Sequence, residues 1–457
     1  MPRSIHAVAV LGAGTMGAQI AAHFANAGVT VLLLDLSADV AREGLARVRA
    51  FKPDPFFAPE AAALITTGGF GSDLDRLEQV DWVVEAVVEQ LDVKRDLLAR
   101  VDKVRRPGTI ASSNTSGIRV AALAEDRSDD FRRHWLGTHF FNPPRYLHLL
   151  EVIPTAETDP AVADRVACFA DRSLGKGVVM AKDSPNFIAN RIGIVGAMLA
   201  LNALESGRYS IEEIDAITGP AIGRPKSATF RTMDIAGLDV LAHVARNQSL
   251  ELPALVNAMI ERGWVGDKGG QGFYKKQKTA SGSEILTLDP ASMTYRPKQP
   301  VRLASLDAAR SIEDTGARIK SLFTGRDKTG GFLREALAPT LFYAAKVMPA
   351  VATSIDDVDR AMKWGFGWEL GPFETIDAIG AHELLRKAAV PEDVPLLAPF
   401  LRGERDRFRN DGVPPAAAGL QILKAAKDRQ RVVRKNAGAS LIDLGDGVLA
   451  VEFHSKM

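Results

Sequence analysis

Residues 7–35 read AVAVLGAGTMGAQIAAHFANAGVTVLLLD, and this stretch decides the fold of the N-terminal part of the chain. It begins with the continuous apolar run Ala7–Leu11, which is typical of a buried strand in a parallel sheet. A glycine-rich loop at 12–17, a helical pattern over 18–27 and a second apolar strand ending in Asp35 follow. This order predicts a βαβ unit at the start of a doubly wound α/β sheet.

The loop at 12–17 has the spacing G-x-G-x-x-G in the context that this motif requires. The first glycine permits the tight turn, the second lets the backbone approach a pyrophosphate, and the third lets helix and strand pack closely. Unpaired N–H groups at the helix N-terminus would face the phosphates. Asp35 would bond the adenosine ribose and repel a 2′-phosphate, which predicts NAD and disfavours NADP. The predicted cofactor-binding residues of this unit are Gly12, Gly14, Thr15, Met16, Gly17 and Asp35.

Further buried strands are predicted at 82–89, 109–112 and 178–182. Ligands bind at the carboxyl ends of such strands, so Glu85 or Glu89 would line the cofactor cleft. A helix-capping or surface role is the alternative for each carboxylate. The polar loop at 113–117 could supply hydrogen-bond donors beside the nicotinamide, or could be only a turn with an N-cap.

The stretch at 137–153, GTHFFNPPRYLHLLEVI, predicts two apolar strands around a proline turn. In a hairpin, positions whose numbers sum to a constant face each other, and 139 + 151 = 2 × 145 places the centre inside the turn. His139 would therefore lie opposite Glu151, and a histidine oriented by a partly buried carboxylate can act as a general base. A structural ion pair is the alternative interpretation.

The second half of the chain has a helical pattern from about 190 to 435 and contains a duplication. The segment at 214–237 recurs at 358–380, and the second half of the match keeps a constant offset, since 373 − 230 = 143 and 380 − 237 = 143. Two such copies would pack on each other as two subunits of a dimer would, so we expect that one chain needs no partner subunit. The polar stretch 275–287 predicts a mobile connector, and the tail 439–453, with Asp-Gly between apolar runs, predicts a hairpin.

Composition limits the class of protein. Length of 457 residues suggests two or three domains, and Lys+Arg minus Asp+Glu is 57 − 56 = +1, which gives no electrostatic case for nucleic acid or an anionic membrane. The single cysteine, Cys168, excludes an internal disulfide, and its apolar neighbours predict a position in the core. No signal peptide, membrane span or metal-ligand spacing is visible. A soluble, cytoplasmic protein is expected.

Together the glycine loop with its aspartate, the motifs SSNTS (112–116), THFFNPP (138–144), LEVI (150–153) and DSPNFIANR (183–191) resemble the NAD-dependent 3-hydroxyacyl-CoA dehydrogenases of fatty acid β-oxidation. The resemblance covers roughly residues 5–430. It implies an α/β then all-α fold, with a Rossmann-type NAD-binding domain (1–184) and two tandem helical domains (185–300 and 301–435). Residues 436–457 resemble the first hairpin of a crotonase-fold hydratase domain, and no hydratase activity is expected of this chain.

The resemblance also implies roles for individual residues in oxidising (3S)-3-hydroxyacyl-CoA to 3-oxoacyl-CoA. His139 would take the 3-hydroxyl proton, Glu151 would hold the imidazole, and Asn142 would support the pair. The remaining implied contacts are Ser116 and Asn190 with the reacting end of the substrate, and Glu85, Glu89 and Lys94 with the nicotinamide side of the cofactor. The 36–80 region is shorter than in the family and broken by prolines, so no contact with CoA is assigned there. A dehydrogenase of free 3-hydroxy acids and a non-catalytic NAD-binding protein are the alternatives.

Overall fold

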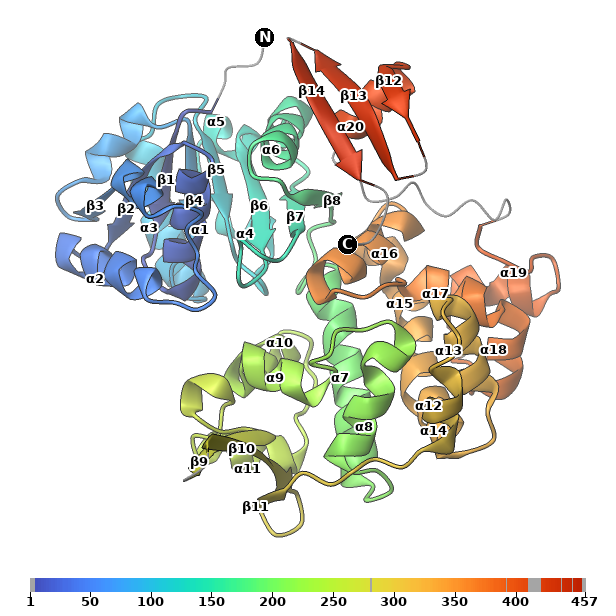
Figure 1. Cartoon of the computed structure of the whole chain (residues 1–457). Coiled ribbons are helices and arrows are strands. Elements are labelled where there is room, and N and C mark those ends of the chain that lie inside the picture. Colours follow the sequence, from blue (N-terminus) through green and yellow to red (C-terminus); the bar gives the residue numbers. More distant parts are fainter. Residues whose placement is uncertain are drawn as a thin grey trace. The chain divides into compact units, whose positions relative to one another are not determined.

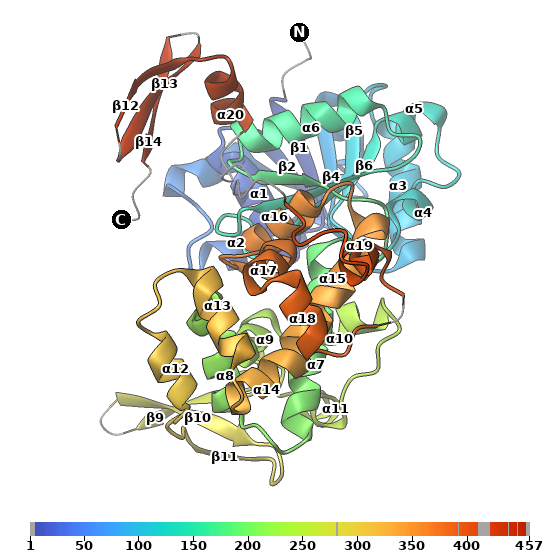
Figure 2. The ribbon, with the colours of Figure 1, turned by 90° about the vertical axis from the view of Figure 1, so that its right-hand side faces the viewer.

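The computed structural model describes residues 5–279, 282–391, 393–409, 421–436, 438–445 and 447–453. These residues belong to two compact units. The first unit contains 1–115, 120–180 and 413–457, and the second contains 116–119 and 181–412. Each unit has its own set of elements, and Figures 1 and 2 label its α-helices and strands.

The elements of the first unit are β1 (Ala7–Leu11), α1 (Thr15–Asn26), β2 (Thr30–Asp35), α2 (Ala38–Arg49), η1 (Pro59–Leu64), β3 (Ile65–Gly69), η2 (Leu74–Gln79), β4 (Trp82–Glu85), α3 (Leu91–Val104), β5 (Ile110–Ser113), α4 (Val120–Leu123), α5 (Asp129–Arg133), β6 (Trp135–Phe140), β7 (Leu149–Pro154), α6 (Pro160–Arg172), β8 (Gly177–Met180), α20 (Gln421–Asp428), β12 (Val432–Lys435), β13 (Ala439–Gly445) and β14 (Val448–Phe453).

The elements of the second unit are α7 (Ala189–Glu205), α8 (Ile211–Thr218), η3 (Pro220–Ile222), α9 (Phe230–Ala236), α10 (Leu238–Arg246), α11 (Ala254–Glu261), η4 (Asp267–Gly269), β9 (Tyr274–Thr279), β10 (Gly282–Asp289), β11 (Thr294–Pro297), α12 (Ala304–Ala309), α13 (Thr315–Thr324), α14 (Lys328–Phe332), the π-turn η5 (Leu333–Leu337), α15 (Ala338–Val351), α16 (Ile355–Phe366), α17 (Pro372–Ile379), α18 (Ala381–Lys387), η6 (Pro395–Leu397) and α19 (Ala398–Leu401).

An eight-stranded sheet in the order β3-β2-β1-β4-β5-β6-β7-β8 forms the centre of the first unit. The strands from β3 to β6 are parallel, and β7 pairs antiparallel with β6 and parallel with β8. Alternate residues such as Val8 and Val10 share a core with α1, α2 and α6 on one face, and helices lie on both sides of the sheet in Figure 1. The order 3-2-1-4-5-6 confirms the predicted doubly wound fold.

Two details of the first unit differ from expectation. Strand β4 ends at Glu85 rather than at 89, because the Val87 N–H donates to the Glu85 side chain and the chain leaves the sheet there. Cys168 is exposed and not in the core. Helix α6 buries the face that carries Val162, Val166 and Ala170, and position 168 lies outside that stripe although its neighbours are apolar.

The second unit contains two copies of one helical arrangement, and the same side-chain hydrogen bonds occur in both copies. The carboxylate of Asp215 accepts from the N–H groups of Thr229 and Phe230, and that of Asp359 accepts from the N–H groups of Phe373 and Glu374. Two later carboxylates accept from pairs of N–H groups in the same way, Asp234 from Phe273 and Tyr274, and Asp377 from Phe408 and Arg409. Both copies lie in one unit, where α7 packs against α15 and α16 (Figure 2). The predicted duplication is confirmed.

The stretch predicted as a mobile connector is instead part of a three-stranded antiparallel sheet, in the order β11-β10-β9. Leu288 of β10 is fully buried, and the Tyr274 hydroxyl of β9 donates to Asp215 at 2.7 Å. These two anchors hold the sheet to the helices. Its polar composition was misleading because β9 and much of β10 face solvent.

The predicted tail hairpin is present as the antiparallel pair β13 and β14, and Asp446 of its turn lies outside the described residues. A third strand, β12, pairs with β13, and α20 packs on the same strand. No single described helix is long and apolar enough to cross a membrane. The bent pair Lys328–Val351 and Ile355–Phe366 together has the length and composition of a membrane span.

Candidate active site

The glycine loop between β1 and α1 is shaped by two close contacts. A Cβ at Gly12, where φ is +102°, would lie 2.6 Å from the Ala86 carbonyl oxygen, and a Cβ at Gly17 would lie 1.9 Å from the Gly12 carbonyl oxygen. At Gly14, by contrast, no protein atom lies within 4 Å of the Cβ position. The protein itself therefore gives no packing reason for glycine at 14, whereas a phosphate approaching the backbone would.

The start of α1 is suited to an anion. Its N-cap, Gly14, provides no side-chain hydrogen bond, and the first turn carries no acidic residue. The N–H groups of this turn and the positive end of the helix dipole are thus not satisfied by a capping side chain. Asp35 tightens the loop, because its carboxylate accepts from the N–H of Ala13 at 2.6 Å and from that of Leu36 at 2.7 Å. These features fit a dinucleotide bound across the loop.

The residues predicted from separate strands gather at one edge of the sheet. Leu11 pairs with Glu85, Glu85 with Ser113, and Ser113 with Gly137 across β1, β4, β5 and β6. These strands are parallel, so their carboxyl ends share this edge, and His139 lies two residues beyond Gly137 on β6. The glycine loop, Glu85 and His139 therefore follow one another along the edge where ligands of such sheets bind.

A buried ion-pair cluster lies at this edge. The Lys94 ammonium is 2.7 Å from a Glu85 oxygen and 3.2 Å from a Glu89 oxygen, and it also donates to the Val87 carbonyl. Lys94 and Glu85 are almost completely buried, whereas the Glu89 side chain is 21% exposed. The Ser113 hydroxyl donates to Glu85. Glu85 and Lys94 thus bond each other, and Glu89 is the member best placed to meet a ligand; its contact with the cofactor stays a prediction.

The predicted hairpin register is confirmed, with His139 on β6 directly opposite Glu151 on β7. The His139 Nδ1 lies 2.7 Å from a Glu151 carboxylate oxygen, and the two residues are 5% and 0% exposed. A carboxylate only accepts, so this bond favours the tautomer with the proton on Nδ1. The lone pair then lies on Nε2, the nitrogen that can accept a proton. The Phe141 ring packs edge-on against the imidazole, with ring centroids 4.6 Å apart.

The turn after β6 is fixed by two residues that the sequence did not single out. Gln19 of α1 donates to the Asn142 side-chain oxygen at 3.0 Å, which links the turn to the glycine-loop helix. Lys176 is buried and donates to the carbonyl oxygens of Pro144 and Leu147, and burial lowers its pKa to about 7. Among the described residues, the hydrogen bond of the Asn142 side chain goes to Gln19 and not to His139 or Glu151. The sequence offered one signal for Gln19 and Lys176: each is a polar residue isolated in an apolar or glycine-rich run.

Ser116 and Asn190 belong to the second unit. The Ser116 carbonyl oxygen accepts from the Asn186 N–H at 3.1 Å, and Asn190 is in the first turn of α7, four residues further along the chain. The structure thus brings both predicted residues to the same end of α7. No described residue bonds the side-chain amide of Asn190.

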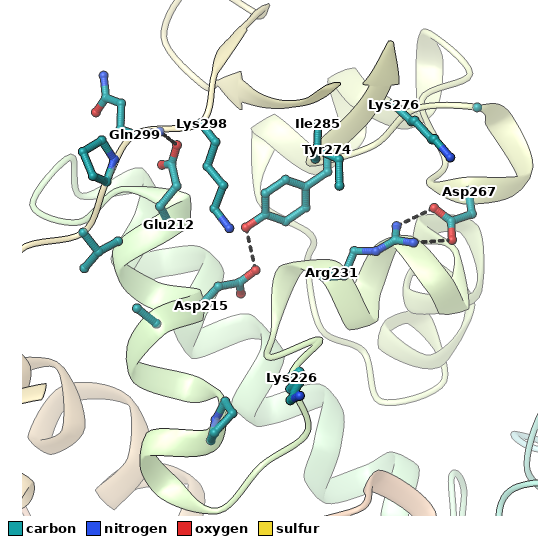
Figure 3. A pocket seen from close by; sticks show the side chains of 15 residues that line it. Glu212, Asp215, Lys226, Arg231, Asp267, Tyr274, Lys276, Ile285, Lys298 and Gln299 are labelled. Carbon is teal, nitrogen blue, oxygen red and sulfur yellow. Dashed lines mark hydrogen bonds and ion pairs between the residues drawn. The ribbon is translucent and has the colours of Figure 1, made fainter. Parts of the chain in front are cut away.

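A hollow of about 1110 Å³ in the second unit lies among α8, α9 and the β9–β11 sheet (Figure 3). Its carboxylates are engaged: Asp267 forms a two-pronged pair with Arg231, and Asp215 accepts from Tyr274. Among the described residues that line it there is no histidine. It therefore holds no counterpart of the His139–Glu151 pair.

Comparison with known proteins agrees with this site. Residues 7–184 match the NAD-binding domain of 3-hydroxyacyl-CoA dehydrogenase, and residues 187–276 and 331–391 both match its C-terminal domain. The two matches to one domain agree with the internal repeat.

Two curated relatives extend along the chain. A Bacillus subtilis protein named as a 3-hydroxyacyl-CoA dehydrogenase is 43% identical over 503 aligned positions, covering 100% of this chain and 63% of that protein. A Rickettsia felis protein named as a fatty acid oxidation complex trifunctional enzyme is 30% identical, covering 99% and 63%. The chain thus spans less than two thirds of the length of either relative.

A crystal structure of 3-hydroxybutyryl-CoA dehydrogenase from Escherichia coli K12 shares the fold, with a TM-score of 0.61 and 23% identity over 91% of this chain and 98% of that one. The sheet order, the glycine loop and the matched domains lead to the same assignment. The chain belongs to the 3-hydroxyacyl-CoA dehydrogenase family.

Proposed function

We propose that this protein oxidises (3S)-3-hydroxyacyl-CoA to 3-oxoacyl-CoA with NAD as the electron acceptor, as a step of fatty acid β-oxidation. The observation that carries the proposal is the buried His139–Glu151 pair, 2.7 Å apart, at the edge of the sheet that holds the glycine loop. Family membership and the name of the Rickettsia felis relative support the substrate class.

The reaction removes a proton and a hydride from the substrate. His139 Nε2 accepts the proton of the 3-hydroxyl group as the C3–O bond becomes a carbonyl. Glu151 holds the imidazole through Nδ1 and stabilises the positive charge that develops on it. NAD, when bound at the glycine loop, would supply the acceptor for the hydride that leaves C3. Ser116 and Asn190 hydrogen-bond the reacting end of the substrate.

A dehydrogenase acting on free 3-hydroxy acids would use the same pair, because the proton and hydride steps do not involve the CoA thioester. The two functions differ only in the substrate that the enzyme accepts. Activity on free 3-hydroxybutyrate without activity on its CoA thioester would therefore establish the alternative. A non-catalytic NAD-binding protein would show neither.

The experiment measures NADH formation from (3S)-3-hydroxybutyryl-CoA by the wild type and by His139→Gln. Loss of a general base should lower kcat by roughly 10² to 10⁴. His134→Gln is the matched control, because His134 also lies beside a carboxylate, 3.5 Å from Asp130, but immediately precedes β6 and is five residues before His139. Equal losses in both variants would argue against His139 as the base.

We also propose that one chain is the functional unit, because both helical copies pack within the second unit. Light scattering should then give the mass of one chain. A stable two-chain particle would contradict this proposal.

A further inference from the structure

An apolar pocket of about 160 Å³ lies inside the second unit, beside α7. Small residues of the helix open it: Gly193 and Gly196 line one wall, and a Cβ at Gly193 would lie 2.5 Å from the Phe366 ring. Asn190, at the start of the same helix, also lines the pocket. The pocket is therefore connected to a residue of the proposed reaction.

One charged side chain, Arg224, lines this otherwise largely apolar pocket. Its guanidinium carbon lies 3.9 Å from the centroid of the Trp368 ring, at stacking distance. No described carboxylate lies within ion-pair distance of it, and no described residue accepts a hydrogen bond from its guanidinium. Burial lowers the pKa of Arg224, and no neighbouring acid offsets this effect. A guanidinium in such surroundings normally has an anionic partner.

The contact with Trp368 determines which part of Arg224 is available. A guanidinium at this distance from an aromatic ring interacts through its flat face, so the N–H groups around its edge can still donate. That edge matches the two oxygens of a carboxylate or the oxygens of a phosphate. The ring also reduces the motion of a long side chain, so less conformational entropy is lost on binding.

We propose that Arg224, supported by Trp368, binds an anionic oxygen group of the acyl-CoA substrate. This inference rests on the proposed function, because Asn190 in the same pocket is a substrate residue of that proposal. Two parts of a substrate can supply the anion: a phosphate of the CoA moiety, or a carboxylate at the far end of the acyl chain. Both present the same chemistry to the guanidinium.

Four substrates separate the two sources: 3-hydroxyhexanoyl and 3-hydroxyhexanedioyl groups, each as the CoA thioester and as the N-acetylcysteamine thioester, which lacks phosphates. Wild type and Arg224→Gln are compared by kcat/KM with each. Loss of a charged hydrogen bond predicts a fall of roughly tenfold to a hundredfold. A fall with both CoA thioesters but neither short thioester identifies the phosphate. A fall confined to the two hexanedioyl substrates identifies the carboxylate.

An equal fall with all four substrates, or no fall with any, would overturn the inference, because either means that Arg224 meets no anion of the substrate. Arg262→Gln is the matched control, since Arg262 lies over Trp264 at 5.2 Å but lines neither pocket. Arg224→Lys keeps the positive charge, so its kcat/KM should lie between those of Arg224→Gln and the wild type. This variant replaces Arg224→Gln in the comparison if the glutamine variant does not fold. If the wild type turns over none of the four substrates while it binds NAD, the proposed function fails as well.

Discussion

Glu151→Gln tests the catalytic pair with little change in shape. Glutamine has the size of glutamate and its carbonyl oxygen can still accept from Nδ1 of His139, so the substitution removes the charge and keeps a hydrogen bond. Unit charges about 4 Å apart attract by about 4 kcal/mol at the effective dielectric constant of a protein, which is an upper limit for the stabilisation of the protonated imidazole. At 1.36 kcal/mol per tenfold change, kcat should fall by roughly 10² to 10³.

The assay is NADH formation at saturating NAD and (3S)-3-hydroxybutyryl-CoA, with thermal unfolding of each variant as the control for folding. The exchange of a charged for a neutral hydrogen bond should cost about 1 kcal/mol of stability, so the variant should remain folded. The KM for the substrate should change much less than kcat, because Glu151 acts on the base and not on the bound thioester.

The double variant decides whether Glu151 acts through His139. If it does, His139→Gln/Glu151→Gln should be no slower than His139→Gln alone, since the carboxylate has no imidazole left to orient. Multiplied losses in the double variant, or a normal kcat in Glu151→Gln, would refute the reasoning. The 2.7 Å contact would then be a structural ion pair.

Four further predictions concern the first unit. Gly17→Ala should destabilise the protein by about 1–3 kcal/mol in urea unfolding, because the new methyl group meets a carbonyl 1.9 Å away. Gly14→Ala should fold normally and weaken NAD binding by roughly tenfold or more in titration calorimetry, because its methyl group enters the space that a phosphate needs. Lys94→Met should lower the free energy of unfolding by about 3–5 kcal/mol, because it leaves two carboxylates without their shared cation. Burial lowers the pKa of His23 from 6.5 to about 3. The free energy of unfolding is therefore retained above pH 6.5 and falls as the pH drops below that value. Between pH 7.5 and 5.5 the wild type should lose about 1.4 kcal/mol more of this free energy than His23→Leu in urea unfolding.

Local patterns in the sequence were sufficient for the parts of the fold in which one segment determines its own structure. The glycine loop predicted the βαβ unit because Gly12 and Gly17 each meet a local steric demand of the turn and the helix packing. The His139–Glu151 register followed from the symmetry of a hairpin about its turn, and the helical repeat followed from a fixed offset. The prediction that the strand continues beyond Glu85 was wrong, because the Glu85 side chain accepts a hydrogen bond from the Val87 N–H and the chain turns there. Hydrophobic periodicity contains no information about such a side-chain bond.

Contacts between distant residues were beyond such patterns. The β9–β11 sheet was predicted as a connector because its polar side chains face solvent, while its anchors, Leu288 and the Tyr274–Asp215 bond, depend on helices far away in the sequence. The engagement of Lys94 between two glutamates and the stacking of Arg224 on Trp368 also required the folded chain. Single polar residues gave no pattern from which these partners could be read.

The most direct test of the account is the rate of NADH formation from NAD and (3S)-3-hydroxybutyryl-CoA by wild type and by folded His139→Gln. The account predicts turnover by the wild type and a loss of roughly 10² to 10⁴ in kcat for the variant, with NAD affinity unchanged. Turnover by His139→Gln at the wild-type rate would contradict the assignment of the base. No turnover by a wild type that binds NAD would contradict the proposed reaction.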